Sequence, residues 1–172
     1  SVTGVQTCAL PICMGSGIEE RHRRCGHWWE PHVKNTREFI RTNLPQCARV
    51  AVLGAGRLID LDASALESLS QEVHLLDADA GCRQAWRTAF GPAFREKVVP
   101  RIEDVTGCMR DWAQQVRGAR RGKALEQALS SLRAPMPRWA DEPFDAIVSL
   151  NLLGQIPLYW RDLIRKIGRA HV

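Results

Sequence analysis

The sequence has no apolar run long enough to cross a membrane. A helical span needs about 20 consecutive apolar residues, and no run in the 172 residues approaches that length. The first residues also lack the basic stretch followed by an apolar stretch that marks a secretory signal. These two absences predict a protein of the cytoplasm that does not enter a membrane.

Cysteine pairs at metal-binding or redox spacing are also missing. The six cysteines are scattered, with no Cys-x-x-Cys among them, so the pattern indicates reduced, isolated thiols. Residues 21–32 gather three histidines, a cysteine and two tryptophans. The spacing of Cys25, His27 and His32 nevertheless fits no zinc pattern, and a fourth ligand is missing. We therefore expect no metal site.

The composition is that of an ordinary globular domain. Hydrophobic residues make up 45% and charged residues 25% of the chain, and the net charge is +5. A basic cluster at 118–123 has no interleaved aromatic residues and no nucleic-acid motif beside it. We therefore expect a solvated basic surface there and no nucleic-acid partner.

One stretch combines a strand, a glycine turn and the start of a helix. Val50–Leu53 is an unbroken apolar run that suits a strand buried on both faces. Gly54 and Gly56 end it, and a helical pattern begins near Asp62. Glycines let the backbone approach a ligand closely, and free helix N–H groups can point at it. The pattern thus predicts a cradle for a nucleotide-type ligand, although Ile59 replaces the last glycine of the dinucleotide motif G-x-G-x-x-G.

The rest of the chain alternates between helical and strand patterns. We expect helices at 32–42, 62–71, 80–90 and, with an interruption near 118–123, at 107–132, and further strands at 73–77, 97–102 and 146–150. Pro100 predicts an edge position or a bulge for its strand, and His74 is expected to be a core histidine. This order predicts an α/β fold with a Rossmann-like, doubly wound, mainly parallel sheet, of which about the first four strands are present.

Three features, in this order, resemble class I S-adenosylmethionine-dependent methyltransferases. They are the turn Gly54-Ala55-Gly56, the acid Asp77 at the end of the second strand, and Phe144-Asp-Ala-Ile-Val-Ser149 followed by Asn151-Leu-Leu. The resemblance covers about residues 48–160. It implies transfer of a methyl group from S-adenosyl-L-methionine to an acceptor that the sequence does not identify.

The resemblance also implies a cofactor site at the carboxyl ends of the strands. Asp77 would accept hydrogen bonds from ribose hydroxyls, and Asp104, after the third strand, would lie near the adenine. The implied cofactor-binding residues are Leu53, Gly54, Ala55, Gly56, Asp77, Ala78, Asp104 and Asn151. No catalytic residue is assigned, because methyl transfer from an activated sulfonium needs mainly in-line orientation.

Two other functions share the early part of this pattern. An NAD(P)-dependent oxidoreductase would have the same first strands, although Ile59 and the fourth-strand motif speak against it. A non-catalytic Rossmann-like module would keep the fold without binding a cofactor.

Both ends of the chain resemble translated sequencing-adapter read-through of metagenomic assemblies, at 1–12 and 166–172. Leaving them out, we expect an N-terminal helical segment at 13–47 and an incomplete Rossmann-like domain at 48–165. Residues 13–20 are expected to be flexible. Pro31 is expected to open a helix that could lie over the cofactor, as N-terminal helices often do in the resembled family.

Two further expectations concern exposed surfaces of this domain. Trp28 or Trp29 could join a lid over the cofactor, but a core position is the preferred expectation for them. The fourth strand would have an unpaired edge, which favours self-association of the chain.

Overall fold

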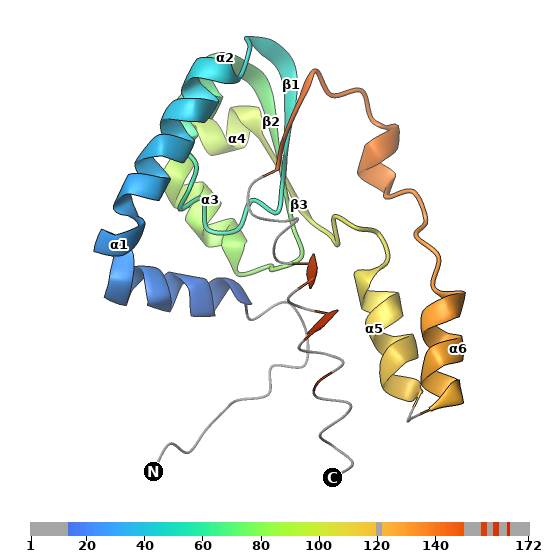
Figure 1. The fold of residues 1–172 in the computed structure, drawn as a ribbon. Coiled ribbons are helices and arrows are strands. Elements are labelled where there is room, and N and C mark those ends of the chain that lie inside the picture. The colour runs from blue at the N-terminus through green and yellow to red at the C-terminus, as the bar shows by residue number, and fades with distance from the viewer. Residues whose placement is uncertain (1–13, 120–121, 150–155, 158–159, 162–164, 166–172) are drawn as a thin grey trace.

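The computed structural model describes residues 14–119, 122–149, 156–157, 160–161 and 165. Figure 1 shows a central parallel sheet with helices packed beside it. The elements along the chain are α1 (Met14–Asn43), β1 (Cys47–Leu53), α2 (Ala63–Leu69), β2 (Ser70–Asp77), α3 (Cys82–Phe90), α4 (Ala93–Lys97), β3 (Val98–Ile102), α5 (Met109–Gly118), α6 (Lys123–Ser131), the 3-10 helix η2 (Arg138–Asp141) and β4 (Ala146–Ser149).

The sheet has the strand order β3-β2-β1-β4, and all its pairings are parallel. This is the order of the first four strands of a Rossmann sheet, so the predicted α/β, Rossmann-like fold is confirmed. β1 lies in the middle, where Val50 is in register with Val73 on one side and with Ala146 on the other. β3 occupies an edge, as Pro100 predicted, since proline cannot donate to a further strand.

Side chains that alternate along β1 fill two separate cores. On one face, Val50 and Val52 pack with Leu66 of α2, Trp86 of α3 and Phe94 of α4. This is the larger core, and Figure 1 shows α1 to α4 on its side of the sheet. Burial on both faces explains why β1 has a continuous apolar run.

The second face of the sheet is covered by the connection between α6 and β4. Ala51, Leu53 and Leu76 form a smaller cluster there, against which Trp139 and Phe144 pack. Helices α5 and α6 lie side by side beyond this connection (Figure 1). They share a third small cluster around Ala113 and Val116.

The N-terminal helix differs from the expectation. It begins at Met14 and not at Pro31, which lies inside it, and its one non-helical residue is Cys25 (φ −127°, ψ 18°). The good helix formers of residues 18–24 outweigh the neighbouring glycines, and Glu20 stabilises the turn through ion pairs with Arg23 and Arg24. The prediction of a flexible segment at 13–20 was therefore wrong for the described residues from Met14 on.

The tryptophans of this helix are not core residues. Trp28 is 76% exposed, and Trp29 is partly buried, with its ring tilted against that of His22. Their helix packs on the sheet side through Ile40 in the larger core, against which Leu44, just after the end of the helix, also packs. The expected core position was wrong because helical periodicity does not decide which face of α1 meets the sheet, and that contact is made by Ile40 near the end of the helix.

The remaining predicted elements are found within a few residues of their expected ends. The helical stretch 107–132 is two helices, α5 and α6, with the break where glycines and basic residues cluster. The fourth strand is described up to Ser149, and its predicted last residue, Leu150, lies outside the described residues. Among the described helices, none has the length and apolar character that a membrane crossing requires.

Among the described residues, Trp86 is the largest fully buried side chain, and its indole Nε1 donates to the carbonyl of Gly56 at 2.7 Å. We expect Trp86→Ala to lower the free energy of unfolding by about 3–5 kcal/mol, as a large aromatic cavity does. The matched control is Trp28→Ala, which should change it by less than about 0.5 kcal/mol because that side chain is exposed. Urea unfolding followed by circular dichroism measures both, and equal effects would contradict this core assignment.

Candidate functional site

The loop after β1 is a tight turn fixed to the end of β2. Gly54 and Gly56 both have left-handed backbone angles, with φ of 67° and 51°, which glycine adopts without strain. The N–H groups of Gly54 and Ala55 both donate to the carbonyl of Leu76, at 2.9 and 3.0 Å. The predicted glycine turn therefore exists and lies at the carboxyl ends of the two central strands.

Asp77 joins this turn to the loop after β2. One carboxylate oxygen accepts the N–H of Gly56 and the other accepts the N–H of Asp79, each at 2.8 Å. Burial raises the pKa of Asp77 above its ordinary value, against the opposing effect of these two hydrogen bonds. Two site residues predicted from distant parts of the sequence are thus in direct contact.

The loop between β2 and α3 is held by a second acid. Asp79 is buried, and its carboxylate accepts the N–H of Gly81 at 2.8 Å. Burial, together with the nearby acids Asp77 and Asp79, raises the pKa of the Cys82 thiol to about 12. Cys82 is therefore a neutral, unreactive thiol at physiological pH.

Arg57 follows the glycine turn and is a residue that the sequence analysis missed. Its side chain is 22% exposed, and its Nη1 lies 3.4 Å from Glu19 Oε2 on α1. Its Nε is buried and has no hydrogen-bond partner. A buried donor without a partner costs free energy, so this guanidinium is a candidate ligand-binding group. Its place directly after Gly56 was the only signal in the sequence.

The start of α2 differs from the cradle that the sequence suggested. Asp62 is the N-cap, six positions beyond Gly56, and its side chain accepts the N–H of Ser64 at 3.0 Å. This hydrogen bond and that of the Ser64 hydroxyl lower the pKa of Asp62, against the effect of burial. The carboxylate of Asp62 therefore already occupies the N-terminus of α2, where an anionic group of a ligand would otherwise bind.

Two of the predicted cofactor-binding residues could contribute only part of what was expected. Leu53 and Ala55 are buried in the two cores, so only their backbone atoms can face a ligand. Ala78 is partly buried between Asp77 and Asp79. Asn151 lies outside the described residues.

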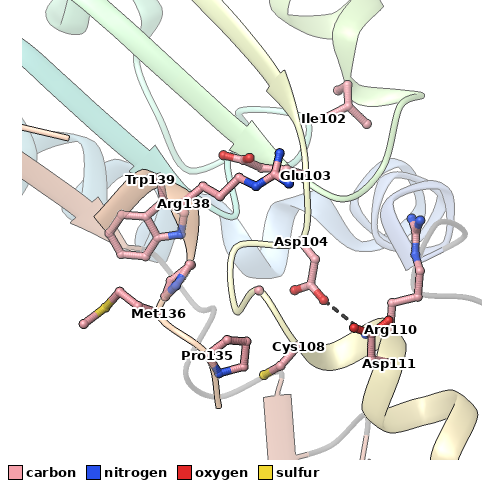
Figure 2. Close-up of a pocket in the computed structure, with 12 residues that line it drawn as sticks. Ile102, Glu103, Asp104, Cys108, Arg110, Asp111, Pro135, Met136, Arg138 and Trp139 are labelled. Carbon is pink, nitrogen blue, oxygen red and sulfur yellow. Dashed lines mark hydrogen bonds between the residues drawn. The ribbon is translucent and has the colours of Figure 1, made fainter. Parts of the chain in front are cut away.

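Asp104 lies at the same edge of the sheet but serves the start of α5. Its carboxylate accepts the N–H and hydroxyl of Thr106 at 3.0 and 2.7 Å. It also accepts the N–H of Arg110 at 3.1 Å (Figure 2). The end of β3 lies close to Asp77, because the N–H of Glu103 donates to the Asp77 carbonyl at 2.9 Å. The backbone of Asp104, the next residue, is therefore near Asp77, but the Asp104 carboxylate binds the start of α5.

Asp104 also borders a cavity of about 530 Å³ beyond β3. Figure 2 shows side chains of the α5 start on one side of it and of the connection to η2 on the other. Its lining consists of Ile102, Glu103, Asp104, Gly107, Cys108, Arg110, Asp111, Pro135, Met136, Pro137, Arg138 and Trp139. Neither the glycine turn nor Asp77 is part of this lining, so the cavity and the turn are separate features of the same edge.

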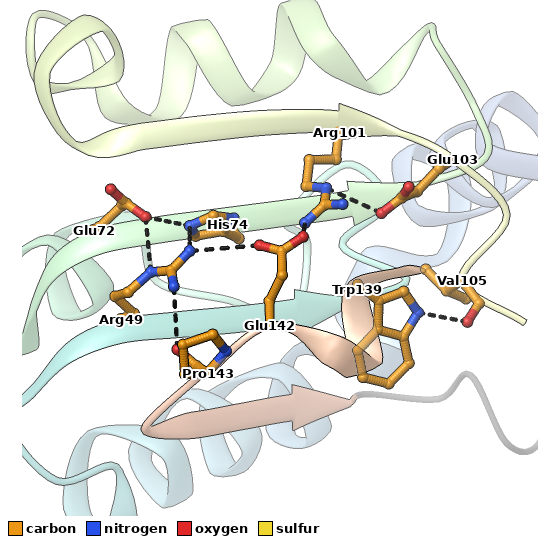
Figure 3. A network of polar contacts seen from close by, with 9 residues as sticks. All are labelled: Arg49, Glu72, His74, Arg101, Glu103, Val105, Trp139, Glu142 and Pro143. Atoms are coloured by element: carbon orange, nitrogen blue, oxygen red, sulfur yellow. Dashed lines mark hydrogen bonds and ion pairs between the residues drawn. The ribbon is translucent and has the colours of Figure 1, made fainter. Parts of the chain in front are cut away.

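A polar network ties the connection before β4 to the second face of the sheet (Figure 3). Arg49 on β1 contacts Glu72 at 3.1 Å and Glu142 at 3.4 Å. Glu142 also pairs with Arg101 on β3. Hydrogen bonds from His74 and Arg101 lower the pKa of Glu72 and Glu142, respectively. The network therefore anchors the connection to three strands.

His74 belongs to this network and is buried, as expected of a core histidine. Its Nε2 contacts Glu72 Oε1 and lies 3.3 Å from Arg49 Nη2, and its ring packs on Phe144. Its Nδ1 is buried without a hydrogen-bond partner. These contacts give His74 a place in the sheet packing, away from the glycine turn.

Within the described part of the chain, no three histidine, cysteine or acidic side chains gather as metal ligands would. The described cysteines Cys25, Cys47, Cys82 and Cys108 are free thiols. The acids of the candidate site instead accept hydrogen bonds from backbone N–H groups.

Comparisons with protein-family models, with curated proteins and with solved structures found no match to this chain. Its function must therefore be inferred from its own residues and their arrangement in the fold.

The cap of α2 gives a pH-dependent prediction. We expect Asp62→Ala to lower the free energy of unfolding by about 1 kcal/mol at neutral pH, and Asp62→Asn, which keeps a capping oxygen, to cost little. Because the pKa of Asp62 is lowered in the folded protein, its contribution is complete above the pH at which an unfolded aspartate titrates. It is lost as the pH falls through the lowered pKa. Urea unfolding at several pH values tests this, and a penalty that does not change with pH would contradict it.

Proposed function

We propose that this chain binds S-adenosyl-L-methionine at the carboxyl ends of β1 and β2 and is part of a methyltransferase. The observation that carries the proposal is the contact between Asp77 and the glycine turn, because it brings an acid and an open backbone turn to one place. In sheets of this kind, ligands bind outside the carboxyl ends of the strands, where the strand order reverses. Here the order reverses at β1, which has β2 on one side and β4 on the other.

Asp77 has the capacity to bind a ribose in addition to the two loops. Each carboxylate oxygen can accept about two hydrogen bonds, and each is shown accepting one backbone N–H. The remaining lone pairs suit the two hydroxyls of an adenosyl ribose. Burial of the Asp77 carboxylate costs free energy and raises its pKa. Hydrogen bonds from a ribose in this position would offset part of that cost.

The acids at the start of α2 disfavour a phosphate group at that position. A pyrophosphate normally sits at the N-terminus of the helix after the glycine turn, but here that position is occupied by the carboxylate of Asp62. Two more acids lie near the turn: Asp60 follows it in the sequence, and Asp77 accepts the N–H of Gly56. A dinucleotide would bring negative charge to this place, whereas a sulfonium cofactor brings a positive one.

When bound, the cofactor would supply a methyl group on an already activated sulfur. The contribution of the protein is then mainly to orient the adenosyl part through Asp77 and the backbone of Gly54 and Gly56. We assign no general base, since the methyl acceptor is not identified. The NAD(P)-dependent oxidoreductase and the non-catalytic module remain as the alternatives to be tested.

Calorimetric titration with S-adenosylhomocysteine, with NAD as comparison, tests the proposal. We expect saturable binding of S-adenosylhomocysteine and much weaker binding of NAD. Asp77→Asn should weaken the former roughly tenfold or more, because hydrogen bonds to a charged group contribute about 1.5–3 kcal/mol. The control is Glu126→Gln on the exposed surface of α6, which should leave the affinity unchanged.

Each other outcome of this titration has a definite meaning. Preferential binding of NAD would replace the proposal by the oxidoreductase. Failure of both ligands to bind a folded chain, as judged by a cooperative thermal transition, would favour the non-catalytic module.

We further propose that the chain self-associates through β4. Within the described residues, β4 pairs with β1 alone and lies at the end of the sheet. Its Ile147 is 54% exposed, and an apolar edge strand can pair with another chain.

Sedimentation velocity tests this self-association. Ile147→Lys is expected to shift the distribution toward monomer, because a lysine on an edge strand opposes pairing. The conservative control Ile147→Val should not. A monodisperse monomer of the unmodified chain would contradict the proposal.

A reducing compartment, such as the cytoplasm, is the location that fits this proposal. The described cysteines are free thiols, which is the usual state of cysteine in that compartment.

A further inference from the structure

Arg57 directly follows the glycine turn, and its contacts are incomplete. Its guanidinium lies beside the loop before α3, where a Cβ built on Gly81 would be 3.4 Å from Nη2. It is thus positioned between the turn and the loop that Asp77 connects. Its Nε remains buried without a partner. A guanidinium with an unused donor beside a proposed ligand site is suited to bind an anionic group of that ligand.

The ion-pair partner that Arg57 does have comes from α1. Glu19 Oε2 lies 3.4 Å from Nη1, and the Glu19 side chain is 57% exposed. Glu19 is on the part of α1 that precedes the non-helical residue Cys25; we refer to residues 14–24 as the arm. Figure 1 shows the arm turning sharply away from the rest of α1. An exposed pair at this distance is weak, so an anion that binds Arg57 more closely can replace Glu19.

We propose that Arg57 binds the carboxylate of the amino-acid part of the cofactor, and that Glu19 occupies Arg57 when the cofactor is absent. This inference rests on the proposed function, and it identifies both a specificity contact and an internal competitor. The ligand carboxylate would pair with Nε and Nη2, which share one edge of the guanidinium, in the bidentate geometry that such groups favour. Glu19 contacts Nη1 on the other edge, so the two carboxylates would compete through their mutual repulsion. Binding would then release Glu19 and free the arm to move about Cys25.

Two ligands that differ only in the carboxylate-bearing part separate this inference from the proposed function. S-adenosylhomocysteine contains an amino-acid carboxylate, whereas 5′-methylthioadenosine has the same adenosine and thioether without it. Both are titrated calorimetrically into the full chain. We expect Arg57→Gln to weaken S-adenosylhomocysteine about tenfold or more and to change 5′-methylthioadenosine less than about twofold, because that ligand has no carboxylate for Arg57 to bind.

Removing the competitor should have the opposite effect. Glu19→Gln is expected to strengthen S-adenosylhomocysteine roughly two- to fivefold, the range of a weak exposed ion pair, and to leave 5′-methylthioadenosine unchanged. The matched control is Glu20→Gln, on the same arm, whose partners Arg23 and Arg24 belong to α1 itself. It should alter neither affinity. Because Glu19 is exposed, this variant remains informative even where Arg57→Gln fails to fold.

The outcomes are distinguishable. If both ligands bind and the Arg57 and Glu19 variants affect them equally, or affect neither, the inference is overturned while the proposed function stands. If neither ligand binds the unmodified folded chain, the proposed function fails and the inference fails with it.

Discussion

The central position of β1 is the constraint on which the rest of this structure depends. Its backbone pairs on both sides, and its side chains enter a core on each face, so it can accept only apolar residues between Val50 and Leu53. Because β2 and β4 both pair with it in parallel, their carboxyl ends meet at the same edge. β2 and β3 extend the sheet on one side of β1, and β4 extends it on the other, so the strand order reverses at β1. Ligands of such sheets bind at this point, beside the loop after β1.

At that edge, the carboxylate of Asp77 connects two loops. Asp77 holds Gly56 and Asp79 by their backbone N–H groups, and Trp86 holds the carbonyl of Gly56 from the side of the larger core. The turn is therefore fixed by contacts to β2 and α3 before any ligand arrives. Such preorganisation reduces the conformational entropy that a ligand would otherwise have to overcome.

The acids and cations around the turn have separate roles. Asp62 satisfies the start of α2 and Asp104 that of α5, so these two carboxylates stabilise helices. Arg57 and Glu19 form the weaker, more exposed pair. On the other face of the sheet, the network of Arg49, Glu142 and Arg101 fixes the connection to β4.

The sequence by itself determined the four parallel strands, the helices between them and the positions of Gly54, Gly56 and Asp77, because these depend on local apolar patterns and on backbone angles that only glycine adopts easily. It also led to Asp104 as an adenine contact, while the fold shows that carboxylate engaged by α5. Tertiary structure alone decided that Arg57 meets Glu19, that Trp86 supports the turn and that α1 bends at Cys25. Those features depend on contacts between residues far apart in the chain, which no local pattern encodes.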